Sequence, residues 1–359
     1  MLIVLKRKKA SDMEMTERKK KILAAVVERY ILSGEPVGSK ALVDLPGLSV
    51  SSATVRNDMA DLVTAGYLEQ PHTSAGRIPS SEGYRYYVDN LMGRYELSDK
   101  EKRIIDSKLE GVPSETKSVL RKAGLVLSEL TGCAAVSTTP ADSQAGIRRV
   151  ELVPIGTKTA MVVMLTSSGI LKSRVCRTNS EITIDIVETF YNITKQHFIG
   201  KPAASLSIAK IQTVALSLGD KSFAMTPLLV TLADLAALTE HTELLLEGQS
   251  NLLNYREFES NAYELMEFLR RSEPLSQVFK KYTEKKGTED TPNVLIGREN
   301  LFRELQNSSM IFGEYKVGGR DSGTIGIIGP TRLDYSRLIP SLKYLTDIVS
   351  RILSHNIDD

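Results

Sequence analysis

The chain has 359 residues, of which 42% are apolar and 25% are charged, and this composition is typical of a globular protein with two or three domains. It lacks an apolar run of the ~18–20 residues that a membrane helix needs. Its short apolar start precedes the basic residues 6–9, which is the reverse of a signal peptide. We therefore expect a cytoplasmic protein that has no membrane partner.

The formal net charge of +2 does not by itself indicate a nucleic-acid partner. Residues 1–95 carry 14 Lys and Arg against 11 Asp and Glu, but much of this excess lies in residues 6–9. We interpret residues 1–15 as an extra, disordered N-terminal segment whose basic side chains are solvated. We interpret Met13 and Met15 as alternatives to Met1 for the true start of the chain.

The first predicted elements are short helices joined by tight turns. Residues 16–33 carry an apolar stripe at helical spacing, and Thr16 can cap their N-terminus. A second short helix is predicted at residues 39–43. A third begins after the serines at 51 and 52 and ends at Gly66. Helices of this length and spacing are the outline of a helix-turn-helix.

A hairpin and a fourth helix follow this triplet. The predicted parts are a strand at 67–70, a turn-rich tip at 71–76, an exit at 77–79 and a helix at 80–92. Residues 16–92 therefore predict a winged helix-turn-helix DNA-binding domain. Residues 93–104 are polar and charged, and we interpret them as a linker.

The second half of the chain alternates between helices and strands. Helices are expected at 120–130, 182–198, 228–238, 259–271 and 335–353, and strands at 132–138, 149–153, 160–165, 171–175, 295–296, 310–317 and 323–329. Strands on both sides of a helical block indicate one α/β sheet that is interrupted by a mainly helical insertion. The predicted fold class is therefore α+β with several domains.

Several long motifs resemble the HrcA family of heat-inducible transcription repressors. They are residues 51–62, 66–79, 83–89, 297–302, 323–330 and 332–337. The resemblance implies a GAF-like domain made of residues 105–200 and 263–359, with a dimerisation segment inserted at 201–262. It also implies that a homodimer represses chaperone genes by binding an inverted-repeat operator in double-stranded DNA. In the family, chaperonin keeps the repressor active, and heat stress releases repression.

The third predicted helix fits the major groove, which is wide enough to admit a helix. Arg56 and Asn57 lie on its outward face, and such side chains can bond guanine and adenine in two places at once. We expect Asp58 and Asp61, which would repel phosphate, to face away or to pair with a basic group. The full set of expected DNA contacts is Ser51, Ser52, Thr54, Arg56, Asn57, His72, Thr73, Ser74 and Arg77.

A homodimer is expected because each half of an inverted repeat needs its own reading helix. The leucine-rich stretch of the insertion is the candidate interface, and the same residues could instead be internal core. The expected dimer contacts are Leu228, Leu229, Leu232 and Leu235.

Two other function classes compete with this prediction. A ligand-sensing regulator would use the GAF-like domain to bind a small effector, but this rests on analogy between folds. An enzyme is not expected, because the two cysteines and four histidines follow no catalytic or metal-binding spacing. Residues 323–329 match no nucleotide-binding loop and predict a strand. No metal, cofactor or catalytic residue is therefore expected.

Overall fold

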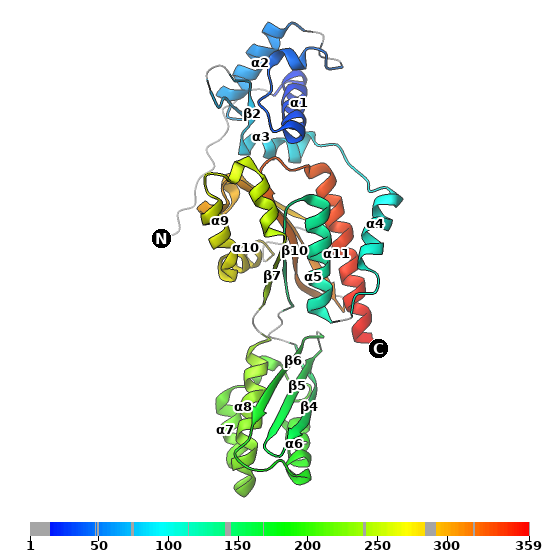
Figure 1. The fold of residues 1–359 in the computed structure, drawn as a ribbon, viewed down its shortest axis with the longest axis vertical. Coiled ribbons are helices and arrows are strands. Elements are labelled where there is room, and N and C mark those ends of the chain that lie inside the picture. Colours follow the sequence, from blue (N-terminus) through cyan, green and yellow to red (C-terminus); the bar gives the residue numbers. More distant parts are fainter. Residues whose placement is uncertain are drawn as a thin grey trace.

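The computed structural model describes residues 15–46, 48, 50–72, 75–113, 115–140, 145–167, 169–239, 242–283, 292–318 and 320–358. Figure 1 shows three units that follow one another along the long axis of the molecule. We call them the N-terminal unit, the central unit and the distal unit. The chain enters the distal unit from the central unit and then returns to it, so the distal unit is an insertion.

The N-terminal unit consists of short helices and a two-stranded hairpin. Its elements are α1 (Glu17–Ser33), the 3-10 helix η1 (Ser39–Leu42), α2 (Ser52–Thr64), β1 (Leu68–Glu69), β2 (Ile78–Pro79), α3 (Ser81–Tyr86) and a π-helical turn η2 (Tyr87–Leu91). Thr16 caps α1, and Gly34 ends it in the left-handed region at φ 68°. The three predicted helices and the hairpin are thereby confirmed.

The central unit is a five-stranded antiparallel sheet between two layers of helices. Its strand order is β7-β3-β10-β9-β8, with β3 (Ala134–Thr138), β7 (Leu244–Glu247), β8 (Asn293–Ile296), β9 (Ser308–Val317) and β10 (Arg320–Pro330). One face packs on α5 (Thr116–Thr131) and α11 (Tyr335–Asp358), and the other face packs on α9 (Ala262–Arg270) and α10 (Ser272–Thr283). The helix α4 (Asp99–Leu109) lies outside α5 and α11 (Figure 1).

Short 3-10 helices connect the larger elements of the central and distal units. They are η3 (Ala203–Ser205), η4 (Gly219–Lys221), η5 (Gln249–Asn254), η6 (Arg256–Phe258), η7 (Gly297–Glu299) and η8 (Arg303–Leu305). The first two belong to the distal unit and the other four to the central unit. Among them, η7 carries Glu299, which forms an ion pair with Arg85 of α3 in the N-terminal unit.

The distal unit has its own sheet and its own hydrophobic core. Its strands β4 (Ile147–Gly156), β5 (Thr159–Thr166) and β6 (Leu171–Arg177) form a sheet that, among the described residues, includes no strand of the central unit. Its helices are α6 (Ile184–His197), α7 (Ile208–Leu216) and α8 (Ser222–Ala237). Side chains alternate along β5, and its buried set packs on the helices. The opposite face of the sheet has no helical cover among the described residues (Figure 1).

This arrangement differs from the expected domain boundaries. The insertion was expected at 201–262 and mainly helical, whereas the separate unit runs from residue 145 to residue 239 and includes three strands. Hairpin-connected strands pair with their neighbours in sequence, and the apolar face that they form is buried by α6 and α8 of the same unit. Residues 244–262 belong to the central unit, where β7 pairs with β3.

The linker after the N-terminal unit is shorter than the predicted 93–104. Ser98 and Glu101 form a reciprocal capping box that starts α4 at Asp99. The segment that joins η2 to α4 is therefore residues 92–98.

Candidate nucleic-acid interface

The helix α2 has one buried face and one free face. Val55, Met59 and Leu62 are almost fully buried and belong to the same core as α1. Arg56 and Asn57 are exposed on the opposite side, as the apolar spacing predicts. Because only the apolar face of α2 packs against the core, the guanidinium group of Arg56 and the amide group of Asn57 are available to a ligand that lies along the helix.

The N-terminus of α2 is fixed by hydroxyl groups. Ser51 Oγ accepts a hydrogen bond from the Thr54 backbone N–H at 3.2 Å and lies 3.0 Å from Thr54 Oγ1. Ser52 Oγ lies 3.1 Å from Ser39 Oγ at the start of η1, so it ties the two helices together. Ser51 is exposed, whereas Ser52 and Thr54 are half-buried. A phosphate at this helix end would meet Ser51 and free backbone N–H groups first.

The two carboxylates of α2 are neutralised by the first turn of α1. Arg18 donates from Nε to Asp58 Oδ2 at 2.7 Å and from Nη2 to Oδ1 at 3.2 Å, and Asp58 is buried. Lys19 Nζ lies 2.8 Å from Asp61 Oδ2. Of the two expected alternatives, that the aspartates face away or that they pair with a basic group, the structure shows the pairing. These pairs remove repulsion that α2 would otherwise exert on a phosphate backbone.

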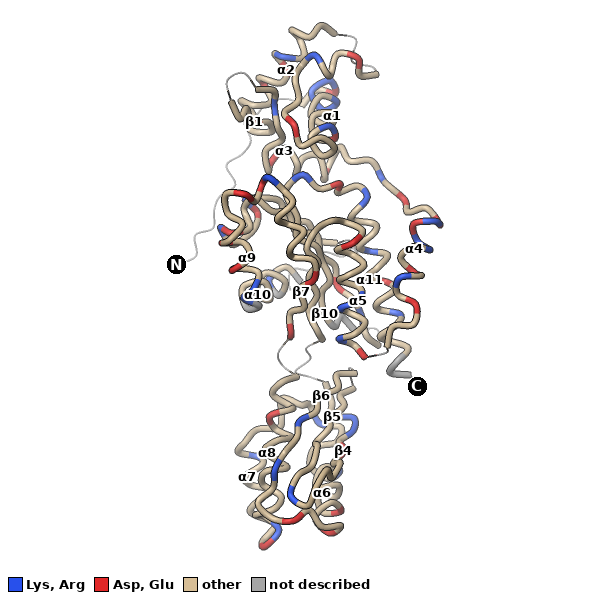
Figure 2. Tube along the Cα trace, viewed as in Figure 1, with Lys and Arg blue, Asp and Glu red and all other residues tan. Residues whose placement is uncertain are grey.

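Arg18 and Lys19 were not singled out from the sequence, although a signal was present. Cations in the first turn of a helix oppose the positive end of its dipole. Two adjacent cations in the first turn therefore indicate that their partners lie on another element. The partners are Asp58 and Asp61 of α2, each at least 40 residues away in the sequence. Figure 2 shows that Lys and Arg positions of α1 and α2 lie at the free end of the molecule.

The hairpin contacts α2 through β1, and its second strand is preceded by a residue that is tied to the segment after α1. Arg77 and Val37 exchange two backbone hydrogen bonds of 2.9 Å. This bridge joins the residue before β2 to the segment that follows α1. A Cβ on Gly76 would lie 2.5 Å from the Val37 carbonyl oxygen, so only glycine fits this approach. His72 is exposed, while Thr73 and Ser74 lie outside the described residues.

The side chain of Arg77, one of the expected DNA contacts, is half-buried. Nη1 donates to the carbonyls of Ala75 and Gly76 at 3.4 Å, and Nε is buried with no partner in the described part of the chain. Arg77 thus shapes the hairpin tip in addition to supplying a positive charge to it.

The tyrosines after the hairpin serve packing. Tyr84 and Tyr87 are buried in the core that spans the N-terminal and central units. Tyr86 packs edge-on against Tyr67 with ring centroids 5.2 Å apart. Burial, together with the neighbouring Glu28, raises the pKa of Tyr87 to about 12. These rings are therefore not a stacking platform for bases.

The four leucines expected at the dimer interface are internal core. Leu228, Leu229, Leu232 and Leu235 are each 0% exposed and pack within the distal unit. They belong to α8, which is apolar on nearly all sides and lies against both the sheet and its neighbouring helices. Because they have no free surface, a partner chain cannot reach them, and a dimer must use other residues.

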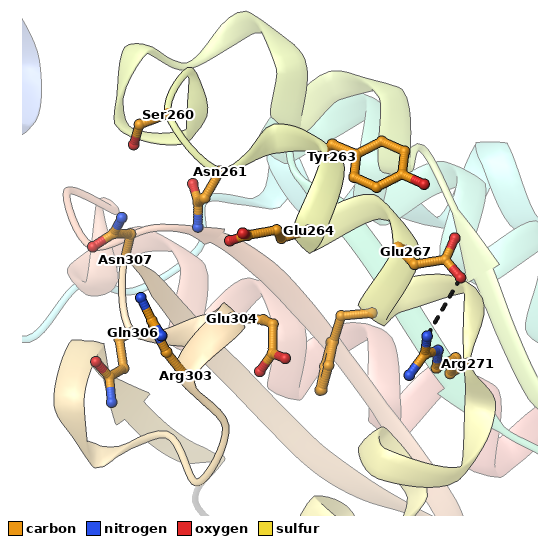
Figure 3. Close-up of a pocket in the computed structure, with 11 residues that line it drawn as sticks. Ser260, Asn261, Tyr263, Glu264, Glu267, Arg271, Arg303, Glu304, Gln306 and Asn307 are labelled. Atoms are coloured by element: carbon orange, nitrogen blue, oxygen red, sulfur yellow. Dashed lines mark ion pairs between the residues drawn. The ribbon is translucent and has the colours of Figure 1, made fainter.

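A cavity of about 660 Å³ lies in the central unit between α9 and η8 (Figure 3). Carboxylates, guanidinium groups and amides line it together with the rings of Tyr263 and Phe268. Glu267 is already paired with Arg270 and Arg271 at 2.9 and 3.6 Å. Since charges of both signs are interspersed around the opening, the lining does not select one class of small effector.

Neither a metal site nor a membrane-spanning helix is present among the described residues. Within them, no set of three or more His, Cys, Asp or Glu is placed to hold a metal ion. Cys133 and Cys176 are free and buried. No helix of the described part combines the length and apolarity needed to cross a membrane.

A family model described as the HrcA protein C terminal domain matches residues 117–339, which is more than half of the chain. The chain belongs to the HrcA family. Two relatives named heat-inducible transcription repressor HrcA match it along nearly their whole length. The protein of Acetivibrio thermocellus is 35% identical and covers 93% of this chain and 95% of its own. That of Thermoanaerobacter sp. (strain X514) is 34% identical and covers 97% and 99%.

A solved structure described as a hypothetical protein has the same fold as this HrcA family member. Its TM-score is 0.66 at 23% identity, and the match covers 95% of this chain and 99% of that chain. The likeness extends over all three units and concerns the fold alone. The family membership confirms the resemblance found in the sequence motifs and favours transcription repression over small-molecule sensing.

Proposed function

We propose that this chain represses heat-shock genes by binding double-stranded DNA through its N-terminal unit, which acts as a winged helix-turn-helix domain. In this proposal α2 lies in the major groove, with Arg56 and Asn57 toward base edges and Ser51 toward phosphate. The hairpin tip with His72 and Arg77 approaches the adjacent backbone. The observation that carries the proposal is the free polar face of α2 beside two aspartates that α1 has neutralised.

The proposal is tested by footprinting the purified full-length protein on the promoter of its own chaperone operon. We expect two protected segments related by a two-fold axis, and each segment should contain one half of an inverted repeat. Protection that is uniform along the promoter, at all protein concentrations that bind, would contradict sequence-specific repression.

We further propose that the uncovered face of the β4–β5–β6 sheet forms the homodimer interface. The strand register places Val153, Met161 and Val175 in one row across the sheet. Leu171 and Val175 are 61% and 58% exposed, and Val153 is 43% exposed. An exposed row of apolar side chains of this kind marks a candidate protein–protein contact. An inverted-repeat operator requires a second copy of the same chain, and we therefore assign that copy to this face.

Sedimentation velocity at micromolar concentration tests this assignment. Val175→Asp should shift the full-length protein from dimer to monomer, because a carboxylate would be buried without a partner at the centre of the interface. Leu216→Asp is the matched control: Leu216 is 83% exposed on α7 of the same unit, away from the sheet. A Val175→Asp protein that stays dimeric would exclude this face.

The central unit is proposed to be a GAF-like domain that carries the other two units, and chaperonin is proposed to maintain the active dimer. The described cysteines are free, so no disulfide between them stabilises the chain. If the dimer slowly loses its native state, a chaperonin is needed to maintain the population of active dimers. Operator binding should decline over hours at growth temperature and persist when chaperonin and ATP are added. Equal retention in both samples would contradict this part of the proposal.

A further inference from the structure

The N-terminal and central units are joined by a close, largely buried contact. Tyr84 of α3 is 1% exposed and packs on Tyr335 at the start of α11, with ring centroids 6.0 Å apart. Tyr335 donates a hydrogen bond to the Thr331 carbonyl at 2.6 Å, and its oxygen lies 2.6 Å from Ser309 Oγ. These rings lie in one hydrophobic core that extends through both units. The contact therefore holds the two units in one relative orientation.

A bidentate ion pair fixes the rotation of α3 on this contact. Arg85 donates to Glu299 of η7 through Nε at 2.8 Å and through Nη2 at 2.5 Å. The same Nη2 donates to the Val294 carbonyl at 2.6 Å. The Glu299 carboxylate is itself held by the Ile296 backbone N–H at 2.9 Å. A planar guanidinium group that donates to both oxygens of one carboxylate fixes the direction of the pair as well as its distance, which a lysine cannot do.

The backbone beside the ion pair is equally close. A Cβ on Gly297, whose φ is +52°, would lie 2.2 Å from Ser81 Oγ at the beginning of α3. The only covalent link between the units in this region is the non-helical segment 92–98. That segment does not itself fix the direction of α2, so this direction depends on the buried ring contact and on the contact at Arg85, Glu299 and Gly297.

The geometry points to Arg85 and Glu299 as positioning residues that select the spacing between operator half-sites. This inference rests on the proposed function, in which two copies bind an inverted repeat. The dimer face and α2 lie at opposite ends of the molecule (Figure 1), so a small rotation at the joint becomes a large shift at the DNA. Both half-sites are engaged only when their separation matches that of the two reading helices.

The expected consequence is a change in spacing preference with little change in half-site affinity. Joining two half-sites in the correct phase raises affinity by roughly 10²–10⁴-fold, and this gain is lost when geometry prevents simultaneous binding. Lengthening the spacer by about five base pairs turns one half-site to the opposite side of the duplex. A clamped dimer should discriminate strongly between the two spacers, and a dimer with a loose joint should discriminate weakly.

The test measures anisotropy of the full-length protein on three duplexes, which are one half-site, the footprinted repeat, and that repeat with five added base pairs. The wild type should prefer the natural repeat over the lengthened one by roughly 100-fold or more. Arg85→Lys and Glu299→Gln should lower this ratio below roughly 10-fold, while half-site affinity stays within about two-fold of wild type. Arg174→Gln, which breaks a 2.7 Å ion pair with Asp234 inside the distal unit, should leave the ratio unchanged.

The outcomes separate the inference from the function on which it rests. If the wild type binds no half-site and no repeat, the proposed function fails. If the wild type binds but ignores the spacer, or if both variants keep the wild-type ratio, the positioning role is overturned. Retained half-site affinity shows that the N-terminal unit of each variant is folded. Should Glu299→Gln fail this criterion, the milder Arg85→Lys decides the result.

Discussion

Replacing Tyr84 with phenylalanine is predicted to stabilise the protein. The Tyr84 hydroxyl is buried and has no hydrogen-bond partner among the described residues. Burial raises the pKa of Tyr84 well above its usual value of 10, so the group is neutral and simply desolvated. A buried hydroxyl without a partner costs about 1–3 kcal/mol. Since phenylalanine keeps the ring contact with Tyr335, the free energy of unfolding should rise by about 1–2 kcal/mol.

Tyr335→Phe is the matched control, and the sign of its effect is opposite. Its hydroxyl makes hydrogen bonds of 2.6 Å with Thr331 and Ser309, so its removal leaves both partners unsatisfied in the core. The expected loss is about 1–3 kcal/mol. Urea unfolding followed by circular dichroism measures both variants, and an unchanged slope shows that the two end states are comparable. A destabilised Tyr84→Phe would mean that the hydroxyl has a partner, and the reasoning would be refuted.

Three further outcomes are expected. Arg77→Ala should weaken binding to operator and scrambled DNA alike and reduce the salt slope by about one unit, as titrations at several salt concentrations will show; a loss confined to the operator would make Arg77 a base reader. Asn57→Ala should instead reduce affinity mainly for the operator, by about 5–150-fold, and an equal loss on scrambled DNA would contradict this role. Hydrogen bonds from the Ser98 backbone and hydroxyl lower the pKa of Glu101 from 4.5 to about 2, so its contribution to stability is present above pH 4.5 and is lost as the pH falls toward 2. The stability difference between wild type and Glu101→Gln should therefore shrink across that range in acid unfolding curves, and a constant difference would contradict it.

Local patterns predicted the N-terminal unit well because its signals are short-range. The apolar stripe and Thr16 cap predicted α1, and the serines at 51 and 52 predicted the start of α2 within one residue. The free face of α2 followed from the same periodicity. The half-burial of Arg77 did not follow from it, because the backbone of Arg77 is paired with Val37, which lies 40 residues earlier in the chain.

The distal unit shows where sequence patterns are insufficient. Alternation along β5 indicates a strand with one buried face, but it does not identify the sheet to which that strand belongs. The leucines of α8 raised a similar ambiguity, since an apolar helix looks the same in a core as at an interface. The burial of these leucines shows that they belong to the core. The exposed row through Val153 and Val175 can be identified only from the strand register.

The most direct test of the account is the ratio of operator affinity to scrambled-DNA affinity for Arg56→Ala. The guanidinium of Arg56 is exposed on the free face of α2, so its removal should leave the dimer folded. A base-reading arginine supplies about 1–3 kcal/mol of discrimination, and the ratio should fall by about 5–150-fold relative to wild type, with little change on scrambled DNA. Fluorescence anisotropy on both duplexes at one fixed salt concentration gives this ratio. An equal loss on both duplexes, or no loss on either, would contradict the assignment of α2 as the helix that reads the operator.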